Sequence, residues 1–328
     1  MRGHARARAN IALAKYWGKC DEALNLPAVP SVSLTLDALL TETEVVRDPA
    51  LREDVVSLDG REETGKGAAK VSAFLDLLRA RAGVDLAAPD RFARVVSVNH
   101  FPTASGLASS ASGFAALAAA GARAYGWDAD LSALSSLARR GSASAARSLF
   151  GGWAELPAGV PGDDRLPARA LHPEGWWDVA LVIALATRAP KSVASRDGMR
   201  ETARTSPYYP AWLACAPGYV HQVKAALAAR DIEAAGRAME ASTFAMHASA
   251  WAAVPGVRYI RGVTLDALDR VEALRRDGVG AWATMDAGPH VKVLCAAGDI
   301  PAVQSAMREV PGVVDVLVAR PGAGVEAS

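Results

Sequence analysis

The chain has 328 residues, enough for one large or two medium domains, and its net charge of +1 argues against a nucleic-acid partner bound by a broad basic face. Hydrophobic residues make up 51% and charged residues 22%, which is typical of a globular enzyme. No apolar run is long enough for a signal peptide or a membrane span. We therefore expect no membrane partner. The three isolated cysteines match neither a metal motif nor a disulfide framework, so we expect a cytoplasmic location.

Strand-like and helical segments follow one another without a regular βα repeat. Apolar residues spaced three and four apart predict helices over 66–82, 264–276 and 300–310, and an alanine-rich helix is predicted over 114–125. Strand character marks 44–47, 54–58, 93–98, 178–186, 281–285, 291–295 and 313–319. This order predicts the mixed α+β class. A segment rich in Pro, Gly and Asp, 161–174, is expected to separate two halves, 1–172 and 173–328.

The first polar segment, 14–21, reads Ala-Lys-Tyr-Trp-Gly-Lys-Cys-Asp. Lys15 and Lys19 flank an aromatic pair and a glycine, so their ammonium groups could hold a polyanion against an apolar wall. Lysines are more often solvated surface residues, and the pattern alone leaves that alternative open.

A segment of small residues, 99–113, leads from a predicted strand into the alanine-rich helix. Small side chains let the backbone approach a ligand closely. Ser109 and Ser110 stand at the helix start, where free N–H groups and the helix dipole favour an anion. The GxxxxGK[ST] phosphate loop is absent from the sequence. A capped, tightly packed helix start is an equally good interpretation.

Three later segments add hydroxyl, basic and acidic groups. Within 139–147, Ser142 and Ser144 could cap the next helix while Arg147, one turn in, faces the same side as an anion ligand. An exposed arginine after a helix cap is the alternative. The segment 191–199 adds basic and hydroxyl groups after an apolar strand. Asp286 follows another apolar strand, where an aspartate is either a turn residue or a catalytic group. Together these segments predict a phosphate pocket containing one acid.

Five blocks of the sequence closely resemble the mevalonate diphosphate decarboxylases, which belong to the kinase-like superfamily shared with galactokinase and homoserine kinase (the GHMP kinases). The blocks are 10–27, 99–112, 139–152, 193–199 and 285–289, and they stand in the family's order. The resemblance implies a GHMP-kinase-like fold of two domains with a cleft between them. The N-terminal half would be like ribosomal protein S5 domain 2 and bind ATP. The ferredoxin-like C-terminal half would carry the catalytic aspartate, and the protein would form a homodimer.

The reaction implied by the resemblance uses ATP and Mg²⁺ to phosphorylate the tertiary 3-hydroxyl of mevalonate 5-diphosphate. Loss of that phosphate and of CO2 then gives isopentenyl diphosphate. ATP is needed because hydroxide is a poor leaving group and phosphate is a good one.

The resemblance also implies a role for individual residues. Asp286 would orient or deprotonate the 3-hydroxyl, Lys19 would neutralise charge on the transferring phosphoryl group, and Arg147 would hold the substrate carboxylate. The implied substrate-binding residues are Lys15, Tyr16, Ser142, Ser144, Arg147, Ser195 and Arg196. The implied ATP-binding residues are Asn99, Pro102, Gly106, Leu107, Ser109 and Ser110, and Ser110 would also contact Mg²⁺.

The sequence departs from the family's usual text at four positions. Cys20 replaces an arginine, Val29 and Pro30 replace Asn-Ser, and His290 replaces an asparagine. These changes keep a decarboxylase of mevalonate 5-phosphate open as an alternative. A mevalonate 3-kinase and a non-catalytic ligand sensor fit less well, because the acid and both lysines are present. A homoserine-type kinase fits less well because the block 15–19 resembles the decarboxylases and not the other branches. The histidines without metal-ligand spacing are expected to be structural or peripheral; they are His172, His221 and His247.

Overall fold

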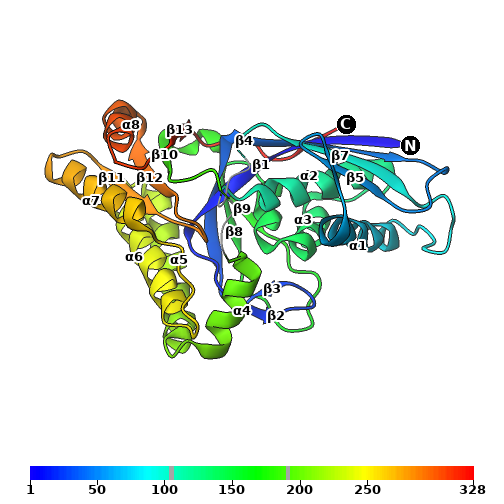
Figure 1. Ribbon diagram of the computed structural model, residues 1–328, viewed down its shortest axis with the longest axis horizontal. Helices are drawn as coiled ribbons and strands as arrows, with labels where there is room; N and C mark the ends of the chain where they lie inside the picture. The colour runs from blue at the N-terminus through cyan, green and yellow to red at the C-terminus, as the bar shows by residue number, and fades with distance from the viewer. Residues whose placement is uncertain (103–106, 190–192) are drawn as a thin grey trace.

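The computed structural model describes residues 1–102, 107–189 and 193–328 and consists of two β-sheets with helices packed against them (Figure 1). None of the described helices is both long and apolar enough to cross a membrane.

The first sheet belongs mainly to the N-terminal half. Its path is β14 (Glu326–Ala327), β1 (Arg2–Ala14), β4 (Ser31–Arg47), β7 (Ala93–Asn99), β5 (Val55–Leu58) and β6 (Arg61–Glu63), and β8 (Trp153–Leu156) with β9 (Arg169–His172) extends it from β4. The long strands β1 and β4 pair antiparallel over most of their length. A separate short hairpin, β2 (Lys19–Asp21) and β3 (Leu26–Pro27), follows β1.

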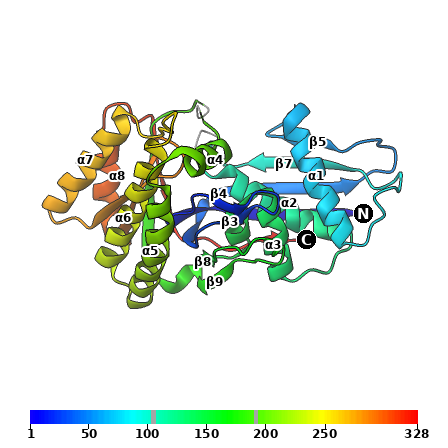
Figure 2. The same ribbon diagram turned by 90° about the horizontal axis from the view of Figure 1, so that it is seen from below.

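Helices α1 (Gly65–Arg81), α2 (Ser109–Ala124) and α3 (Leu131–Gly141) pack together beside this sheet (Figure 2). Helix α2 approaches β1 closely because both surfaces carry small side chains: Ala5 and Ala7 point inward from β1, and most of α2 is alanine. A Cβ at Gly3 would collide with the backbone of Ala120, near the C-terminal end of α2. The N-terminus of α2 therefore lies toward the far end of β1, where the polar motif 14–21 begins.

The second sheet has the order β11 (Ala281–Thr284), β12 (Val291–Ala296), β10 (Val179–Leu185) and β13 (Asp315–Ala319), all antiparallel. Leu181 and Ile183 of β10 pack in one core with α5 (Tyr209–Ala229) and α6 (Ile232–Trp251). Val182, on the opposite face, packs in another core with α7 (Gly262–Arg276) and α8 (Ile300–Arg308). Strand β10 is apolar at every position because both of its faces are covered.

One hydrophobic core joins the two halves. It contains Ile11 of β1, Leu34 of β4, Ile183 of β10 and Met239 of α6. Helix α4 (Ser195–Thr205) lies beside the β2–β3 hairpin (Figures 1 and 2), and Arg200 of α4 forms a 2.7 Å ion pair with Glu22 of the hairpin segment. The two halves are therefore connected on both sides of the polar motif.

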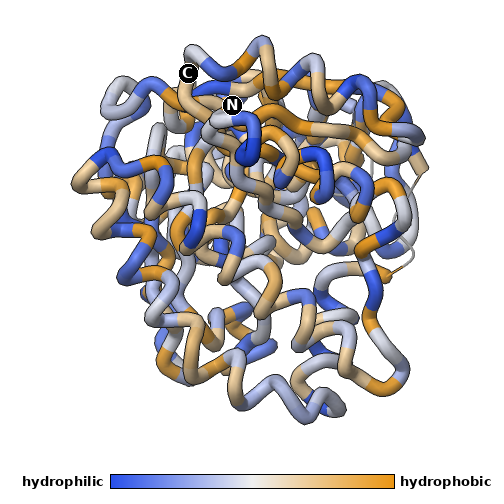
Figure 3. Tube along the Cα trace, turned by 90° about the vertical axis from the view of Figure 1, so that its left-hand side faces the viewer, coloured by the Kyte–Doolittle hydropathy of each residue, from blue (hydrophilic) through white to orange (hydrophobic). Residues whose placement is uncertain are grey.

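The two ends of the chain lie side by side (Figure 3). The backbones of His4 and Ser328 exchange two hydrogen bonds of 2.9 Å, and β14 pairs with β1. Three short 3-10 helices complete the described secondary structure: η1 (Ala143–Leu149), η2 (Glu174–Trp176) and η3 (Ala297–Asp299).

The predicted α+β class is confirmed by the two sheets and their helices. The helices predicted over 66–82, 264–276 and 300–310 correspond to α1, α7 and α8. The helix predicted over 114–125 begins earlier, at Ser109. The boundary after residue 172 stays a prediction, and the last strand of the chain lies in the first sheet.

Candidate active site

A cavity of about 340 Å³ lies where the two halves meet. From the first half, Lys15 and Tyr16 line it just after β1, and Arg147 lines it from η1. From the second half, Arg196 of α4 and Asp286, which follows β11, complete the wall. The cavity therefore gathers several cations and one carboxylate from segments far apart in the sequence.

Asp286 is held between two buried lysines. Its Oδ1 accepts a hydrogen bond of 2.8 Å from Lys15 Nζ, and its Oδ2 accepts one of 3.0 Å from Lys292 Nζ. The side chains of Lys15 and Lys292 are 2% and 0% exposed, whereas that of Asp286 keeps 25% of its surface accessible. The carboxylate is thus fixed by its neighbours and still reachable from the cavity.

The charges in this cluster change the titration of its members. Burial alone raises the pKa of Asp286, but Lys15 and Lys292 outweigh it and hold that pKa well below its usual range. Burial, with repulsion from Lys292 and Arg147, lowers the pKa of Lys15 to about 8, although Asp286 opposes the shift. Near neutral pH the cluster therefore holds an ionised acid and a lysine that loses its proton more readily than usual.

Arg147 is buried and held by neutral groups. Its Nε donates to Ser33 Oγ at 2.8 Å and to Asn10 Oδ1 at 3.2 Å, and one terminal nitrogen donates to Ser31 Oγ at 2.5 Å. Burial lowers the pKa of Arg147 to about 10, with Asp286 opposing. Because these partners carry no negative charge, the positive charge of Arg147 is directed to an anionic ligand of the cavity.

A row of serine hydroxyls leads away from Arg147. Ser144 Oγ lies 3.1 Å from Ser142 Oγ, which lies 3.3 Å from Ser110 Oγ. The expected capping of the next helix by Ser142 is wrong, because its side chain makes no cap hydrogen bond to η1. The hydroxyls instead line the cavity.

A second cavity, of about 260 Å³, adjoins the first beside the N-terminus of α2. Apolar side chains such as Val56, Leu58 and Phe114 form much of its wall, and Asn99, Ser109 and Ser110 add polar groups. Lys70 and Ser110 line both cavities. The α2 N-terminus is not capped by a side chain, because the N-cap residue is Ala108 in a left-handed conformation. The capped-helix interpretation is therefore wrong, and the helix start is suited to an anion.

Three cations surround the region where the two cavities meet. Burial, followed by repulsion from Arg196, lowers the pKa of Lys19 and of Lys70 to about 8. Gly18, with φ of +100°, turns the chain between Trp17 and Lys19 and leaves room for the Tyr209 hydroxyl. Mutual repulsion of this kind is relieved when an anion binds.

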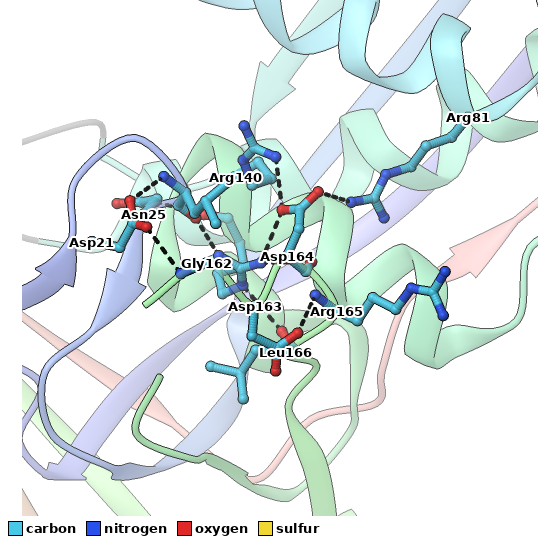
Figure 4. Close-up of polar contacts among 11 residues, drawn as sticks. Asp21, Asn25, Arg81, Arg140, Gly162, Asp163, Asp164, Arg165 and Leu166 are labelled. Atoms are coloured by element: carbon cyan, nitrogen blue, oxygen red, sulfur yellow. Dashed lines mark hydrogen bonds and ion pairs between the residues drawn. The ribbon is translucent and has the colours of Figure 1, made fainter. Parts of the chain in front are cut away.

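The segments that carry Lys19 and Ser142 are tied together by a cluster centred on Asp164 (Figure 4). The Asp164 carboxylate pairs with Arg81 at 3.0 Å, with Arg139 at 3.3 Å and with Arg140 at 2.7 Å. The buried Arg139 also donates to the carbonyl oxygen of Leu24 in the β2–β3 hairpin. This cluster links the hairpin that bears Lys19 to the end of α3, just before Ser142.

Most of the residues predicted from the sequence are brought together. Those lining the first cavity are Lys15, Tyr16, Lys19, Ser110, Ser142, Ser144, Arg147, Ser195, Arg196 and Asp286. Asn99, Ser109 and Ser110 line the second. Leu107 is instead buried in the core that joins the halves, Pro102 is half-buried and is not among the described lining residues, and Gly106 lies outside the described residues.

Four polar residues near the site were not predicted from the sequence: Asn10, Lys70, His247 and Lys292. Lys292 is the one charged residue in the sequence of an otherwise apolar strand, and that exception could have identified it as a functional residue. His247, expected to be structural or peripheral, is buried on α6, and Lys15 and Asp286 both influence its charge. Tyr16 Oη is buried and has no hydrogen-bond partner among the described residues, so it is available to a ligand.

These two sheets, the cation-lined cavity between them and the pocket at the uncapped α2 N-terminus define a GHMP-kinase-like enzyme. The family model of the diphosphomevalonate decarboxylase-like N-terminal domain matches residues 7–166, and that of the mevalonate 5-diphosphate decarboxylase C-terminal domain matches 181–317. The chain belongs to the mevalonate diphosphate decarboxylase family.

Individual relatives agree with this membership. The diphosphomevalonate decarboxylase of Eremothecium gossypii is 35% identical over 298 residues, which cover 87% of this chain and 75% of the relative. A solved structure described as MDDEF in complex with MVAPP, AMPPCP and magnesium is 40% identical, with a TM-score of 0.92 over 100% of this chain and 99% of that one. Another, of the mevalonate diphosphate decarboxylase from Enterococcus faecalis, is 39% identical, with a TM-score of 0.90 over the same shares.

Proposed function

We propose that the protein catalyses the ATP-dependent decarboxylation of mevalonate 5-diphosphate to isopentenyl diphosphate. The observation that carries this proposal is the cavity in which the ionised Asp286 lies among Lys15, Lys19, Arg147 and Arg196, next to a pocket at a helix N-terminus. An acid fixed among cations suits a substrate that has a reacting hydroxyl, a carboxylate and phosphates.

The residues present fit ATP and Mg²⁺. The apolar wall of the second cavity suits an aromatic base, and the α2 N-terminus with Lys70 and Ser110 suits phosphates. No cluster of three or more His, Cys, Asp or Glu side chains that could hold a metal occurs among the described residues. A magnesium ion here would rely on phosphate oxygens and water, with the Ser110 hydroxyl as a protein contact. Bound ATP supplies the phosphoryl group that turns the 3-hydroxyl into a leaving group.

We propose that Asp286 and Lys15 act together on the reacting hydroxyl. Asp286 orients the 3-hydroxyl and accepts its hydrogen bond, while Lys15, whose pKa is about 8, neutralises charge on the oxygen as it is phosphorylated. Lys19 was expected to stand next to this hydroxyl, but the lysines that donate hydrogen bonds to Asp286 are Lys15 and Lys292. We place Lys19 with Arg196 at the phosphates instead.

The remaining groups hold the two ends of the substrate. Arg147, fixed by Ser31 and Ser33, binds the carboxylate until it leaves as CO2, and the nearby carboxylate of Asp286 stabilises positive charge that develops at C3. Tyr16, Ser142, Ser144, Ser195 and Arg196 contact the substrate's anionic groups.

The test follows ADP and CO2 together, with Mg-ATP and either mevalonate 5-diphosphate or mevalonate 5-phosphate. Equal ADP and CO2 from the diphosphate is the expected result. Equal products from the monophosphate alone would identify a monophosphate decarboxylase, and ADP without CO2 would identify a 3-kinase. The absence of both products with either substrate would contradict the proposal and leave a ligand sensor.

The geometry around Cys20 bears on the number of phosphates. Its thiol lies 3.4 Å from the carbonyl oxygens of Pro27 and Gly159, and Cys20 is not among the described residues that line the first cavity. The lost arginine is therefore a weak argument for a smaller substrate, and the diphosphate stays the better proposal.

We also infer a cytoplasmic homodimer with no nucleic-acid or membrane partner. The three free cysteines support a reducing compartment. The exposed positions of α6 include Phe244 and Trp251, which suit contact with a second copy. Light scattering of the purified protein tests the dimer, and cell fractionation tests the location.

A further inference from the structure

Lys292 is a lysine at the centre of a strand that is otherwise apolar. It lies in β12 between Val291 and Val293, opposite Ile183 of β10 and Thr284 of β11, and its side chain is 0% exposed. Its Nζ lies 3.0 Å from Asp286 Oδ2.

Stability alone does not account for a lysine at this position. Taking an ammonium group out of water costs several kcal/mol, and replacing a whole buried ion pair with well-packed apolar side chains of similar volume is often neutral or stabilising. Asp286, with which Lys292 forms its ion pair, belongs to the cavity wall. The presence of Lys292 is therefore better explained by what it does to Asp286.

The two lysines act on different oxygens of the carboxylate. Lys15 reaches Oδ1 from the end of β1 and lines the cavity, whereas Lys292 reaches Oδ2 from β12 and is not among the described lining residues. With Oδ2 held from behind, the carboxylate group has a fixed plane and presents Oδ1 together with Lys15.

We propose that Lys292 is a positioning residue for catalysis: it fixes Asp286 through Oδ2, so that Oδ1 and Lys15 meet the reacting hydroxyl as one pair. This inference rests on the proposed function, in which Asp286 and Lys15 act on the 3-hydroxyl.

Other titratable groups face Asp286 from each packed element. They are Lys15 after β1, Arg147 on η1, His247 on α6 and His290 before β12. Burial lowers the pKa of His247 and of His290 to about 4, so both are neutral near pH 7. Lys292 is thus one of three cations, with Lys15 and Arg147, that act on the carboxylate at that pH.

The test is the pH dependence of kcat in Lys292→Met, which keeps the length and apolar stem but removes the charge. We expect kcat at pH 7 to fall by about tenfold to a hundredfold, because the carboxylate loses its fixed plane. The basic-side inflection should move up from about 8, because Lys292 no longer lowers the pKa of Lys15. The KM for ATP should stay within about twofold, because the second cavity is not altered. Lys292→Arg, which restores the charge, should return the inflection toward its original position.

Lys224→Met is the matched control. Lys224 forms a 2.7 Å ion pair with Glu155, and neither residue is among the described lining residues of the two cavities. It should leave the profile unchanged. A Lys292→Met enzyme with the original basic-side inflection would overturn the proposal, even if its melting temperature and kcat fell together, because a purely structural role predicts that pattern.

Failure of the proposed function gives a different result, namely no ADP or CO2 from the wild-type protein. The pair itself is then tested by urea unfolding of Lys292→Met, Asp286→Asn and the double variant. Strong non-additivity of the two substitutions supports the assigned contact, and additive effects overturn it.

Discussion

Asp286 has its charge balanced before any substrate arrives, because Lys15 and Lys292 each hold one of its oxygens. A carboxylate in this setting is a weak base, since the same cations that keep it ionised oppose its protonation. In the proposed reaction its main contribution is therefore to orient the hydroxyl and to stabilise positive charge at C3.

Replacing Asp286 with asparagine tests this role directly. The amide keeps the shape of the side chain but removes the negative charge, so we expect the rates of ADP and CO2 formation to fall together by about a hundredfold or more. Binding of a non-hydrolysable ATP analogue, measured by calorimetry, should change little. Full CO2 release by Asp286→Asn would refute the role.

The same cluster shows where residue patterns were informative. Asp286 was predicted because it stands at the end of an apolar strand, followed by Gly288 and Pro289, in a block that resembles a known family. Lys292 was not predicted, because the segment 291–295 was interpreted only by its apolar residues. Lys15 meets the acid from the end of β1, whereas Lys19 lies beyond the turn at Gly18, and residue spacing alone does not specify that geometry.

At the scale of elements, the Asp164 cluster fixes the loops that present Lys19 and Ser142. Arg139 is fully buried and reaches two loop segments, the β2–β3 hairpin through Leu24 and the β8–β9 loop through Asp164 and Leu166. The positions of the hairpin and of the serine row therefore depend on one another.

We expect Asp164→Asn to raise the KM for the phosphorylated substrate several-fold and to change kcat much less, because it loosens the phosphate end and leaves Asp286 in place. Because Asp164 is 38% exposed, the loss of unfolding free energy should be only about 1 kcal/mol. Steady-state kinetics and urea unfolding measure the two effects. Asp90→Asn, which alters a surface pair with Arg47, is the control. A fall in kcat with an unchanged KM would contradict this role.

Three helices were predictable from their apolar spacing, whereas strand β1 was not. Helices α1, α7 and α8 follow the three- and four-residue spacing of their apolar residues. Strand β1 was not predicted, because its inward positions are alanines and its outward ones are arginines, which resemble a basic tail. Its partner α2 supplies the matching small surface, and that match is visible only in three dimensions.

At the scale of the whole molecule, two neutral histidines are buried around the junction of the halves. His247 is 3% exposed and His290 is 0% exposed, and His290 Nδ1 accepts a hydrogen bond of 3.1 Å from the backbone N–H of Ala186. Burial, with repulsion from nearby lysines, lowers the pKa of each to about 4 from the ordinary value of 6.5.

This lowering makes stability depend on pH below neutrality. Between pH 6.5 and about 4 the unfolded chain binds protons at these histidines and the folded protein does not, so stability is full above that window and falls as the pH falls through it. Each histidine contributes a slope of up to about 1.4 kcal/mol per pH unit. Urea unfolding between pH 7 and pH 5 measures this slope.

His290→Asn should flatten the curve, because asparagine accepts the Ala186 hydrogen bond without titrating. The exposed His221 provides the control, since His221→Asn should leave the curve as it is. Identical slopes for His290→Asn and the wild type would rule out this contribution.

Lys70 and Ser110 belong to the walls of both cavities. A ligand that draws either side chain toward itself would change the wall of the neighbouring cavity, so we expect the two binding equilibria to be coupled. Thermodynamic reciprocity then applies: whatever factor the occupant of the first cavity imposes on affinity in the second, the occupant of the second imposes the same factor on the first. The shared wall thus makes the affinity for each ligand a property of the pair.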